Sequence, residues 1–258
     1  MTPIVPCCPP RTLARMRAVL WGRDHTELGI TAVEKVDGGV ALALSRGRHR
    51  KVYPYTDPNE DAVAAVVGPR ATLLVLADGH NGWPATEAAL QAVLDDLGDD
   101  PPADLNDDEM AELFWRAQQA VVARSQRWGS DAPESRTTLV VALIAGRRLR
   151  WGSFGDSVVY VAGSAAATRL PSPRHRFIGA RDMPRRVLPD LLEHGRTALH
   201  DNQWLIVASD GFSDFAAHPF PTALLGGNVD AAVVAQGLVN AAFDGGAGDN
   251  VTVGVVAP

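Results

Sequence analysis

Cysteine is scarce in this chain. Only Cys7 and Cys8 occur, side by side near the N-terminus. Two neighbouring cysteines do not make a disulfide framework, and they suit a reducing compartment better than an oxidising one. No residues with metal-ligand spacing accompany the pair, so we assign it no metal role. Cysteine usage therefore favours a cytoplasmic protein.

Long hydrophobic runs are also missing. The longest, Leu73–Ala77 and Leu139–Ala145, are far shorter than the roughly 20 residues that a membrane-spanning helix needs. Leu13–Trp21 does not resemble the apolar part of a signal peptide, because Arg15 and Arg17 interrupt it. There is no excess of basic residues, since the formal net charge is −6. This charge argues against nucleic acid or an anionic membrane as the main partner.

What the chain has in quantity is ordinary globular composition. It contains 258 residues, of which 46% are hydrophobic and 21% are charged. This is enough to bury a sizeable core and argues against general disorder. No internal repeat and no long linker divides the sequence. We expect one domain over residues 1–258, with a loose, proline-rich tail over residues 1–11.

The most informative stretch is Thr72–Gly82, which reads TLLVLADGHNG. A short apolar run bounded by turn residues predicts a strand that is buried on both faces. Asp78 and His80 then lie at the end of a rigid strand. A carboxylate held there is a suitable metal ligand, and an adjacent histidine is a suitable proton carrier. An aspartate and a glycine after a strand also make ordinary turns, so the stretch needs support from elsewhere.

Hydrophobic periodicity predicts the remaining elements. Helical spacing covers Trp83–Leu97, a helix from the N-cap Asn106 to Trp128, and a helix after the N-cap Asp230 to Ala242, and Leu191–Gly195 reads as the end of a short helix. Strands are expected at 40–44, 62–67, 73–77, 137–145, 149–154, 158–162, 204–208 and 251–256. The region Leu170–Pro189 has no clear period and reads as a flap.

Several acidic residues share one context, because they stand at the ends or corners of predicted strands: Glu60, Asp78, Asp156, Asp210 and Asp249. Each alone has an ordinary explanation as a surface or turn residue. Five carboxylates at one end of a sheet would repel one another unless cations neutralised them. An all-oxygen ligand set favours Mg²⁺ or Mn²⁺ over zinc. Two such ions can bind a phosphate and activate a water for in-line attack, while His80 protonates the leaving oxygen.

The same residues carry a resemblance to a known family. The matching pieces occur in the family's order: Asn59-Glu60-Asp61, Ala77-Asp78-Gly79-His80-Asn81-Gly82, Thr137-Thr138-Leu139, Gly155-Asp156-Ser157, Ala208-Ser209-Asp210-Gly211 and Gly248-Asp249-Asn250-Val251-Thr252. In these motifs the chain resembles the metal-dependent PPM (PP2C-type) serine/threonine phosphatases. The resemblance extends from Asn59 to Val256, about three quarters of the chain by the span of its motifs.

The resemblance implies a fold and a set of roles. The fold would be α+β, a four-layer αββα sandwich of two antiparallel sheets flanked by helices. Asp78 would bridge two Mn²⁺ or Mg²⁺ ions, with Glu60 and the Gly79 carbonyl at one ion. Asp210 and Asp249 would complete the other ion. Asp156, together with Asp210, matches the position that holds a third ion, and His80 matches the general acid. The substrate would be a phosphorylated protein, with a serine/threonine kinase as a possible partner.

Substrate handling departs from the family pattern. The family usually has an arginine three residues before the asparagine of its first motif, and Thr56 stands there in this chain. We hypothesise that Arg46, Arg48 or Arg50 binds the substrate phosphate instead, and we include Asn250 as a weaker substrate-binding candidate. Val158 replaces the arginine that usually follows Gly-Asp-Ser. The segment 171–179 also lacks the family's Asp-His pair.

Three functions remain open from the sequence. The first is a metal-dependent protein serine/threonine phosphatase. The second is a pseudophosphatase that keeps the fold and binds partners with little turnover, which only the missing arginine supports. The third is an unrelated metal-binding α/β protein, which would require six coincidental motif matches.

Overall fold

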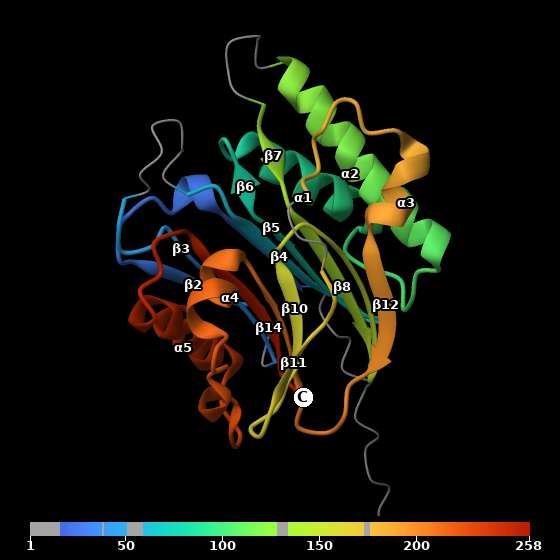
Figure 1. Ribbon diagram of the computed structural model, residues 1–258. Helices are drawn as coiled ribbons and strands as arrows, with labels where there is room; N and C mark the ends of the chain where they lie inside the picture. Colours follow the sequence, from blue (N-terminus) through green and yellow to red (C-terminus); the bar gives the residue numbers. More distant parts are fainter. Residues whose placement is uncertain (1–15, 38, 51–58, 128–133, 173–175) are drawn as a thin grey trace, which may run out of the picture.

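The computed structural model describes residues 16–37, 39–50, 59–127, 134–172 and 176–258, apart from the side chains of residues 125–127. Within these ranges two six-stranded antiparallel sheets lie face to face (Figure 1). The predicted tail, residues 1–11, and Thr56 lie outside the described residues.

The first sheet has the order β1-β4-β5-β8-β9-β12. Its strands are β1 (Met16–Trp21), β4 (Ala62–Val67), β5 (Thr72–Ala77), β8 (Leu139–Ala145), β9 (Arg148–Phe154) and β12 (Glu193–Ala198). The central strand β5 pairs with β4 on one side and with β8 on the other. It is buried from Leu73 to Ala77, as its apolar run predicts.

The second sheet has the order β11-β10-β13-β14-β3-β2. Its strands are β2 (Thr31–Lys35), β3 (Val40–Ser45), β10 (Val158–Ala162), β11 (Ala167–Arg169), β13 (Trp204–Ala208) and β14 (Val251–Val256). The closing strand β14 lies between β13 and β3, so it joins the two ends of the chain. A short pair, β6 (Gly79–His80) and β7 (Arg136–Thr137), follows the end of β5.

Helices cover the outer face of each sheet. On the first sheet lie α1 (Pro84–Leu97), α2 (Asp107–Arg127) and the short α3 (Leu188–Leu191). On the second lie α4 (Asp210–Ala216) and α5 (Ala231–Asp244). Three single-turn 3₁₀ helices complete the described elements, at Gly22–Asp24, Arg185–Val187 and Thr222–Leu225.

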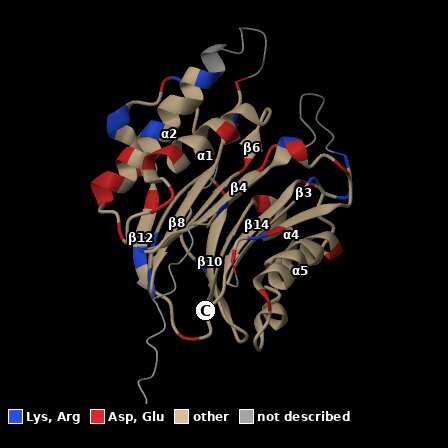
Figure 2. Ribbon diagram, turned by 180° about the vertical axis from the view of Figure 1, so that it is seen from behind, with Lys and Arg blue, Asp and Glu red and all other residues tan. Residues whose placement is uncertain are grey.

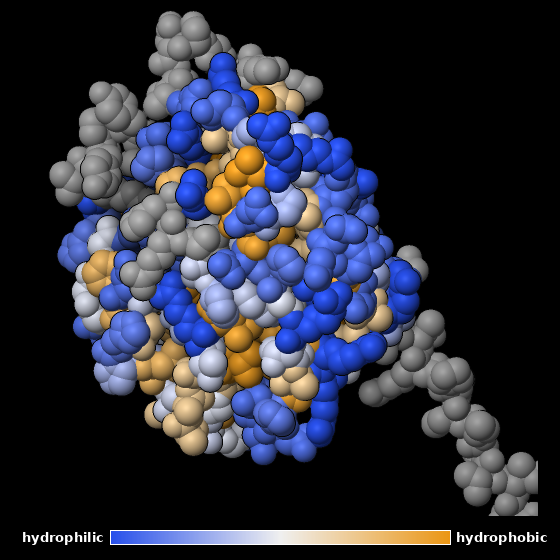
Figure 3. All heavy atoms as spheres, turned by 45° about the vertical axis from the view of Figure 1, so that its right-hand side comes forward, coloured by the Kyte–Doolittle hydropathy of each residue, from blue (hydrophilic) through white to orange (hydrophobic). Residues whose placement is uncertain are grey.

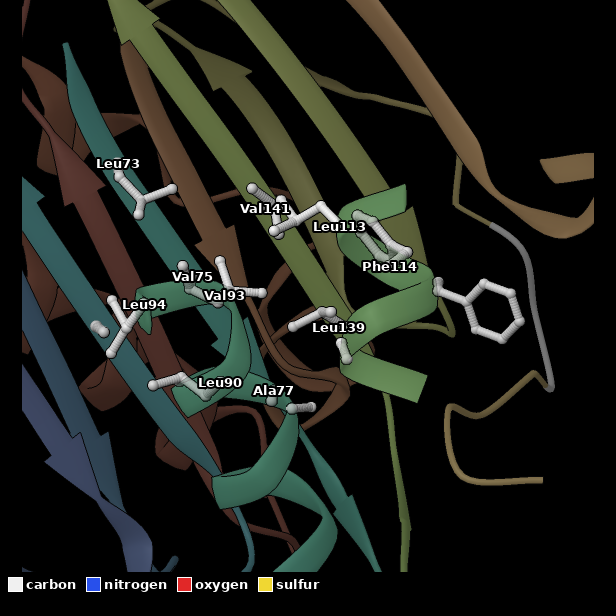
Figure 4. Close-up of a cluster of buried hydrophobic side chains, with 14 of the residues drawn as sticks. Leu73, Val75, Ala77, Leu90, Val93, Leu94, Leu113, Phe114, Leu139 and Val141 are labelled. Atoms are coloured by element: carbon white, nitrogen blue, oxygen red, sulfur yellow. The ribbon is translucent and has the colours of Figure 1, made fainter. Parts of the chain in front are cut away.

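The three interfaces between these layers contain the core. Leu90 and Val93 of α1 and Phe114 of α2 pack on the first sheet (Figure 4). A second cluster fills the space between the sheets, and a third lies between the second sheet and α4 and α5. Burying apolar area at about 25 cal/mol per Å² is the main force that holds such layers together. The predicted αββα sandwich is thereby confirmed.

Helix starts follow the sequence. Asn106 Oδ1 accepts from the Glu109 N–H at 2.9 Å, and Glu109 Oε2 accepts from the Asn106 N–H at 2.7 Å, which is a capping box. Asp230 Oδ1 accepts from the Ala232 N–H at 2.9 Å and caps α5.

Two expectations about elements were wrong. The short helix α3 ends at Leu191, and the residues from Glu193 form β12, because β9 has an open edge with which they pair. No helix was predicted between the strand 204–208 and the helix after Asp230, but α4 begins there at Asp210.

Charged residues and apolar surface patches are distributed unevenly over the molecule. The central strands carry few charged residues, which lie at strand ends and on helices (Figure 2). On the face shown in Figure 3 the hydrophobic residues form small patches among hydrophilic ones. Among the described residues, none of the helices combines the length and apolar character that a membrane-spanning helix needs.

Candidate metal centre

The turn after β5 brings Asp78 against the Asn59-Glu60-Asp61 segment. A Cβ atom on Gly79 would lie 2.5 Å from the Glu60 carbonyl oxygen and 2.6 Å from the Thr86 hydroxyl oxygen. Because no side chain fits in that space, glycine is required for the two segments to approach this closely. The Gly79 backbone is therefore fixed beside Glu60, as the predicted metal-binding roles require.

Thr137 and Thr138 hold Asp78 in place. The Thr138 hydroxyl accepts from the Asp78 N–H at 3.0 Å, and the Asp78 carbonyl accepts from the Thr137 hydroxyl at 2.9 Å. The Thr138 hydroxyl also lies 2.7 Å from that of Ser157, which follows Asp156. Three of the predicted motifs thus meet through buried hydroxyl groups.

Glu60 is buried and points into the turn. Its Oε1 accepts from the Gly82 N–H at 2.5 Å, and its own N–H donates to Asn250 Oδ1 at 3.0 Å. The carboxylate therefore fixes the far end of the Asp78–Gly82 turn. Its role as a metal ligand remains a prediction.

Asp210 is the electrostatic centre of the site. Its pKa is raised to about 7, first by burial and then by negative charges on Asp249, Asp156 and Asp61, while a hydrogen bond with Asp78 opposes the shift. Carboxylates from five sequence-distant motifs are therefore close enough to interact strongly. The convergence that the sequence could not demonstrate is present for Asp78, Asp156, Asp210 and Asp249.

Asp61 is the acidic residue that the sequence analysis left out. It follows Glu60 directly, is buried, and acts on Asp210 from the start of β4. Side chains of consecutive residues in extended chain point in opposite directions. This alternation predicts that Glu60 and Asp61 point in opposite directions. Asp61 therefore points away from the Gly82 turn that Glu60 faces.

The backbone packs equally closely around Asp210 and Asp249. A Cβ atom on Gly211 would lie 1.9 Å from the Asn250 carbonyl oxygen, so the start of α4 touches the loop before β14. Asp249 Oδ1 accepts from the Asn250 N–H at 2.6 Å. Asn250 is buried, and its Nδ2 donates to the Arg46 carbonyl at 2.9 Å. These bonds favour a positioning role for Asn250 over the direct substrate contact that the sequence suggested.

The donor set fits hard divalent cations. It consists of carboxylate and backbone carbonyl oxygens, which Mg²⁺ and Mn²⁺ prefer. Within the described ranges no three Asp, Glu, His or Cys side chains form a closed ligand shell. The mutual repulsion seen at Asp210 is nevertheless what bound cations would relieve. Side chains rearrange more easily than the backbone that brings them together, so a cation could draw these carboxylates into a closed shell.

His80 lies at the edge of this group, on β6. It is exposed, and its ring stacks on that of Phe177 with 5.3 Å between centroids and 21° between planes. The sequence analysis assigned Phe177 no role, since the segment around it has no periodic pattern.

The three arginines proposed for substrate phosphate differ in their surroundings. Arg46 Nη1 donates to the Thr26 carbonyl at 2.7 Å. The Arg48 guanidinium lies 4.6 Å from the centroid of the Phe243 ring and 3.9 Å from Asp244. Arg50 is exposed. A guanidinium has five N–H donors, so these contacts leave donors for a phosphate, and the hypothesis stands as a prediction for all three arginines.

Two grooves lie away from the carboxylates. They have volumes of about 510 and 530 Å³ and flank Arg185 beside α2. Their lining contains none of the predicted ligands.

The two-sheet sandwich thus gathers carboxylates from separate motifs around Asp210. The sequence model of the family described as protein phosphatase 2C matches residues 55–227. The chain belongs to the protein phosphatase 2C family.

Individual relatives agree with this. "Probable protein phosphatase 2C 15" of Oryza sativa subsp. japonica is 27% identical over 158 residues, which are 61% of this chain and 35% of the relative. The chain thus matches about a third of that protein's length. The catalytic domain of the serine threonine protein phosphatase PstP, in complex with two manganese ions, has a TM-score of 0.65 and 25% identity over 88% of this chain and 99% of that domain. Serine/threonine phosphatase Stp1 from Staphylococcus aureus has a TM-score of 0.63 and 19% identity, covering 91% of this chain and 98% of Stp1, which shows a shared fold.

Proposed function

We propose that this chain hydrolyses phosphoserine and phosphothreonine in proteins, with two Mn²⁺ or Mg²⁺ ions and room for a third. The observation that carries this proposal is the convergence of carboxylates from separate motifs on Asp210. Family membership and a similar structure that holds two manganese ions support it.

The roles proposed for the residues are those that the family resemblance implies. Asp78 would bridge the two ions, with the Gly79 carbonyl and Glu60 on one side. Asp210 and Asp249 would complete the second ion, and Asp156 would join Asp210 at a third. Such ions supply the positive charge that binds phosphate oxygens and lowers the pKa of a water.

Proton donation and the positioning of the ligands depend on side chains of the chain itself. His80 would donate a proton to the seryl or threonyl oxygen as it leaves. The buried hydroxyls of Thr137 and Thr138 hold the backbone of Asp78, and Glu60 holds the Asp78–Gly82 turn. This rigidity keeps the ligands in place without reorganisation during the reaction.

The test compares the wild type with Asp210→Ala, with and without Mn²⁺, on a phosphoserine peptide and p-nitrophenyl phosphate. Mn²⁺-dependent turnover that the substitution abolishes would support the proposal. If the wild type binds Mn²⁺ and hydrolyses neither substrate, the proposal fails and a pseudophosphatase that binds partners replaces it. Thr56 would then be the first position to restore to arginine.

A further inference from the structure

The segment 176–180 passes close to two parts of the candidate metal centre, the Gly155-Asp156 corner and His80. At the first, the Arg176 carbonyl oxygen lies 3.0 Å from the position that a Cβ on Gly155 would take, next to Asp156. At the second, Phe177 stacks on His80. The segment is thus a wall of the site.

This wall is anchored on two sides. Ile178 is fully buried and exchanges two backbone hydrogen bonds with Thr137, at 2.7 and 3.0 Å. The side-chain amide of Gln118, on α2, accepts from the Gly179 N–H and donates to the Ala180 carbonyl, both at 2.6 Å. Gly179 has a φ of +111°, and a Cβ there would lie 2.7 Å from Val121 Cγ1. These contacts fix the backbone on either side of Ile178.

The anchors determine where the Phe177 ring points. Thr137 pairs with Gly79 on one side and bridges Ile178 on the other, so β6, β7 and this segment form three adjacent extended chains. Alternation sends Ile178 into the core and its neighbour Phe177 to the opposite face. His80, one residue after Gly79, lies on that same face. Both rings therefore project from the same face of these three extended chains.

The stack limits the freedom of an exposed imidazole. His80 has no hydrogen bond from a described side chain that would orient its ring. A solvent-exposed side chain changes rotamer in picoseconds to nanoseconds. An aromatic ring at 5.3 Å and 21° covers one face of the imidazole and favours ring orientations parallel to it.

We propose that Phe177 is a positioning residue for His80, holding the imidazole in the orientation that delivers a proton to the leaving oxygen. This inference rests on the proposed phosphatase function. In that reaction the water oxygen bonds to phosphorus as the phosphorus–oxygen ester bond breaks. The electron pair stays on the seryl oxygen, which takes the proton from His80. The water releases one proton to solvent, and His80 regains a proton from solvent.

Two substrates whose leaving groups differ in their need for a proton distinguish this positioning role from a purely structural role. A seryl alkoxide needs the proton, whereas p-nitrophenolate leaves readily without it. Phe177→Ala should lower kcat on a phosphoserine peptide about tenfold, and kcat on p-nitrophenyl phosphate clearly less. Phe177→Tyr, which keeps the ring, should restore peptide turnover, and Phe177→Leu, which keeps only apolar bulk, should not. Phe215→Ala removes a half-exposed phenylalanine from α4 and serves as the control, with no loss on either substrate.

A double-mutant cycle shows whether Phe177 acts through His80. In a His80→Ala background, Phe177→Ala should cause no further loss of peptide turnover. A further loss there, or an equal loss on both substrates, would overturn the proposal and assign Phe177 to the shape of the site.

A measurement that does not depend on turnover tests the stacking of Phe177 on His80 independently of the proposed phosphatase function. In the metal-free protein, the His80 ring protons should show an upfield ring-current shift by NMR that Phe177→Ala removes and Phe177→Tyr retains. If the shift is absent from the wild type, Phe177 does not position His80. If the shift is present and the wild type hydrolyses neither substrate, the phosphatase function is overturned, and with it Phe177's role in proton delivery, while the stack itself stands.

Discussion

The side chain of Asn250 joins the last motif of the chain to the first. Its Oδ1 accepts from the Glu60 N–H at 3.0 Å, across 190 residues of sequence, and its Nδ2 donates to the Arg46 carbonyl at 2.9 Å. One buried amide thus connects the loop before β14 to the segments before β4 and after β3. The relative positions of Asp249 and Asp61 depend on this connection.

We expect Asn250→Ala to destabilise the protein and weaken Mn²⁺ binding together. The substitution leaves the Glu60 N–H and the Arg46 carbonyl without these buried partners, at a cost of about 2–4 kcal/mol. Urea unfolding measures the free energy, and calorimetry measures Mn²⁺ affinity. Asn240→Ala is the control, since Asn240 is exposed on α5 and bonds only Gln236 of the same helix in the described structure. It should change stability by less than about 0.5 kcal/mol. Equal effects of the two substitutions would show that Asn250 is not a connection of this kind.

Gly79→Ala tests the close approach of the two metal-binding segments. The added Cβ would lie 2.5 Å from the Glu60 carbonyl, so the Asp78–Gly82 turn must move. Overpacking of this kind costs about 1–3 kcal/mol. We also expect Mn²⁺ affinity to fall, because the Gly79 carbonyl is a predicted ligand.

The matched control for that change is Gly248→Ala, where nothing lies within 4 Å of the new Cβ. It stands next to Asp249, so it tests whether any added methyl near the site has the same effect. Full Mn²⁺ affinity in Gly79→Ala would show that the turn tolerates a side chain and that the close contact has no functional role.

Asp230 makes the stability of α5 depend on pH. A hydrogen bond with Lys35 lowers its pKa from 3.8, and the bond from the Ala232 N–H lowers it further. A depressed pKa means that the charged form stabilises the folded state. This contribution is complete above about pH 3.8 and is lost as the pH falls through the lower folded pKa.

Two substitutions separate the cap from the charge. Asp230→Ala should lower the melting temperature at pH 7 more than Asp230→Asn, because asparagine still caps the helix. The difference between wild type and Asp230→Asn should shrink in 1 M salt and disappear at acid pH. A difference that persists unchanged at acid pH would rule out the Lys35 contribution. Thermal unfolding monitored by circular dichroism measures all three proteins.

The strands that the sequence predicted and those that it missed differ in their place in the sheets. The eight predicted strands correspond to the inner strands, whose residues are almost all buried. In the two six-stranded sheets, the four missed strands, β1, β2, β11 and β12, are the four sheet edges. Edge strands face solvent with part of their surface and carry mixed polar residues, so they show neither a continuous apolar run nor clean alternation.

The residues of the candidate site also differ in whether the sequence could reveal them. Asp78, Asp156, Asp210 and Asp249 could be found because each stands in a turn next to an apolar run. The contacts of Asn250 could not, because they depend on loops that are distant in sequence. Phe177 is held in position by hydrogen bonds of its neighbours, Ile178 to Thr137 and Gly179 to Gln118, and no local pattern records such bonds.

The choice between Glu60 and Asp61 gives the sharpest test of the metal centre. Both are buried and adjacent, but Glu60 bonds the Gly82 N–H whereas Asp61 acts on Asp210. Asp61→Asn removes a negative charge beside Asp210, so Mn²⁺ affinity and Mn²⁺-dependent turnover should fall by about a hundredfold, as for other groups that hold a metal. Glu60→Gln keeps an oxygen that can accept from Gly82, so its effect on Mn²⁺ affinity should be smaller. Calorimetric titration of Mn²⁺ into both variants measures the difference. The reverse order, with Glu60→Gln the more damaging, would show that Glu60 contributes more to metal binding than Asp61 and leave Asp61 a structural carboxylate.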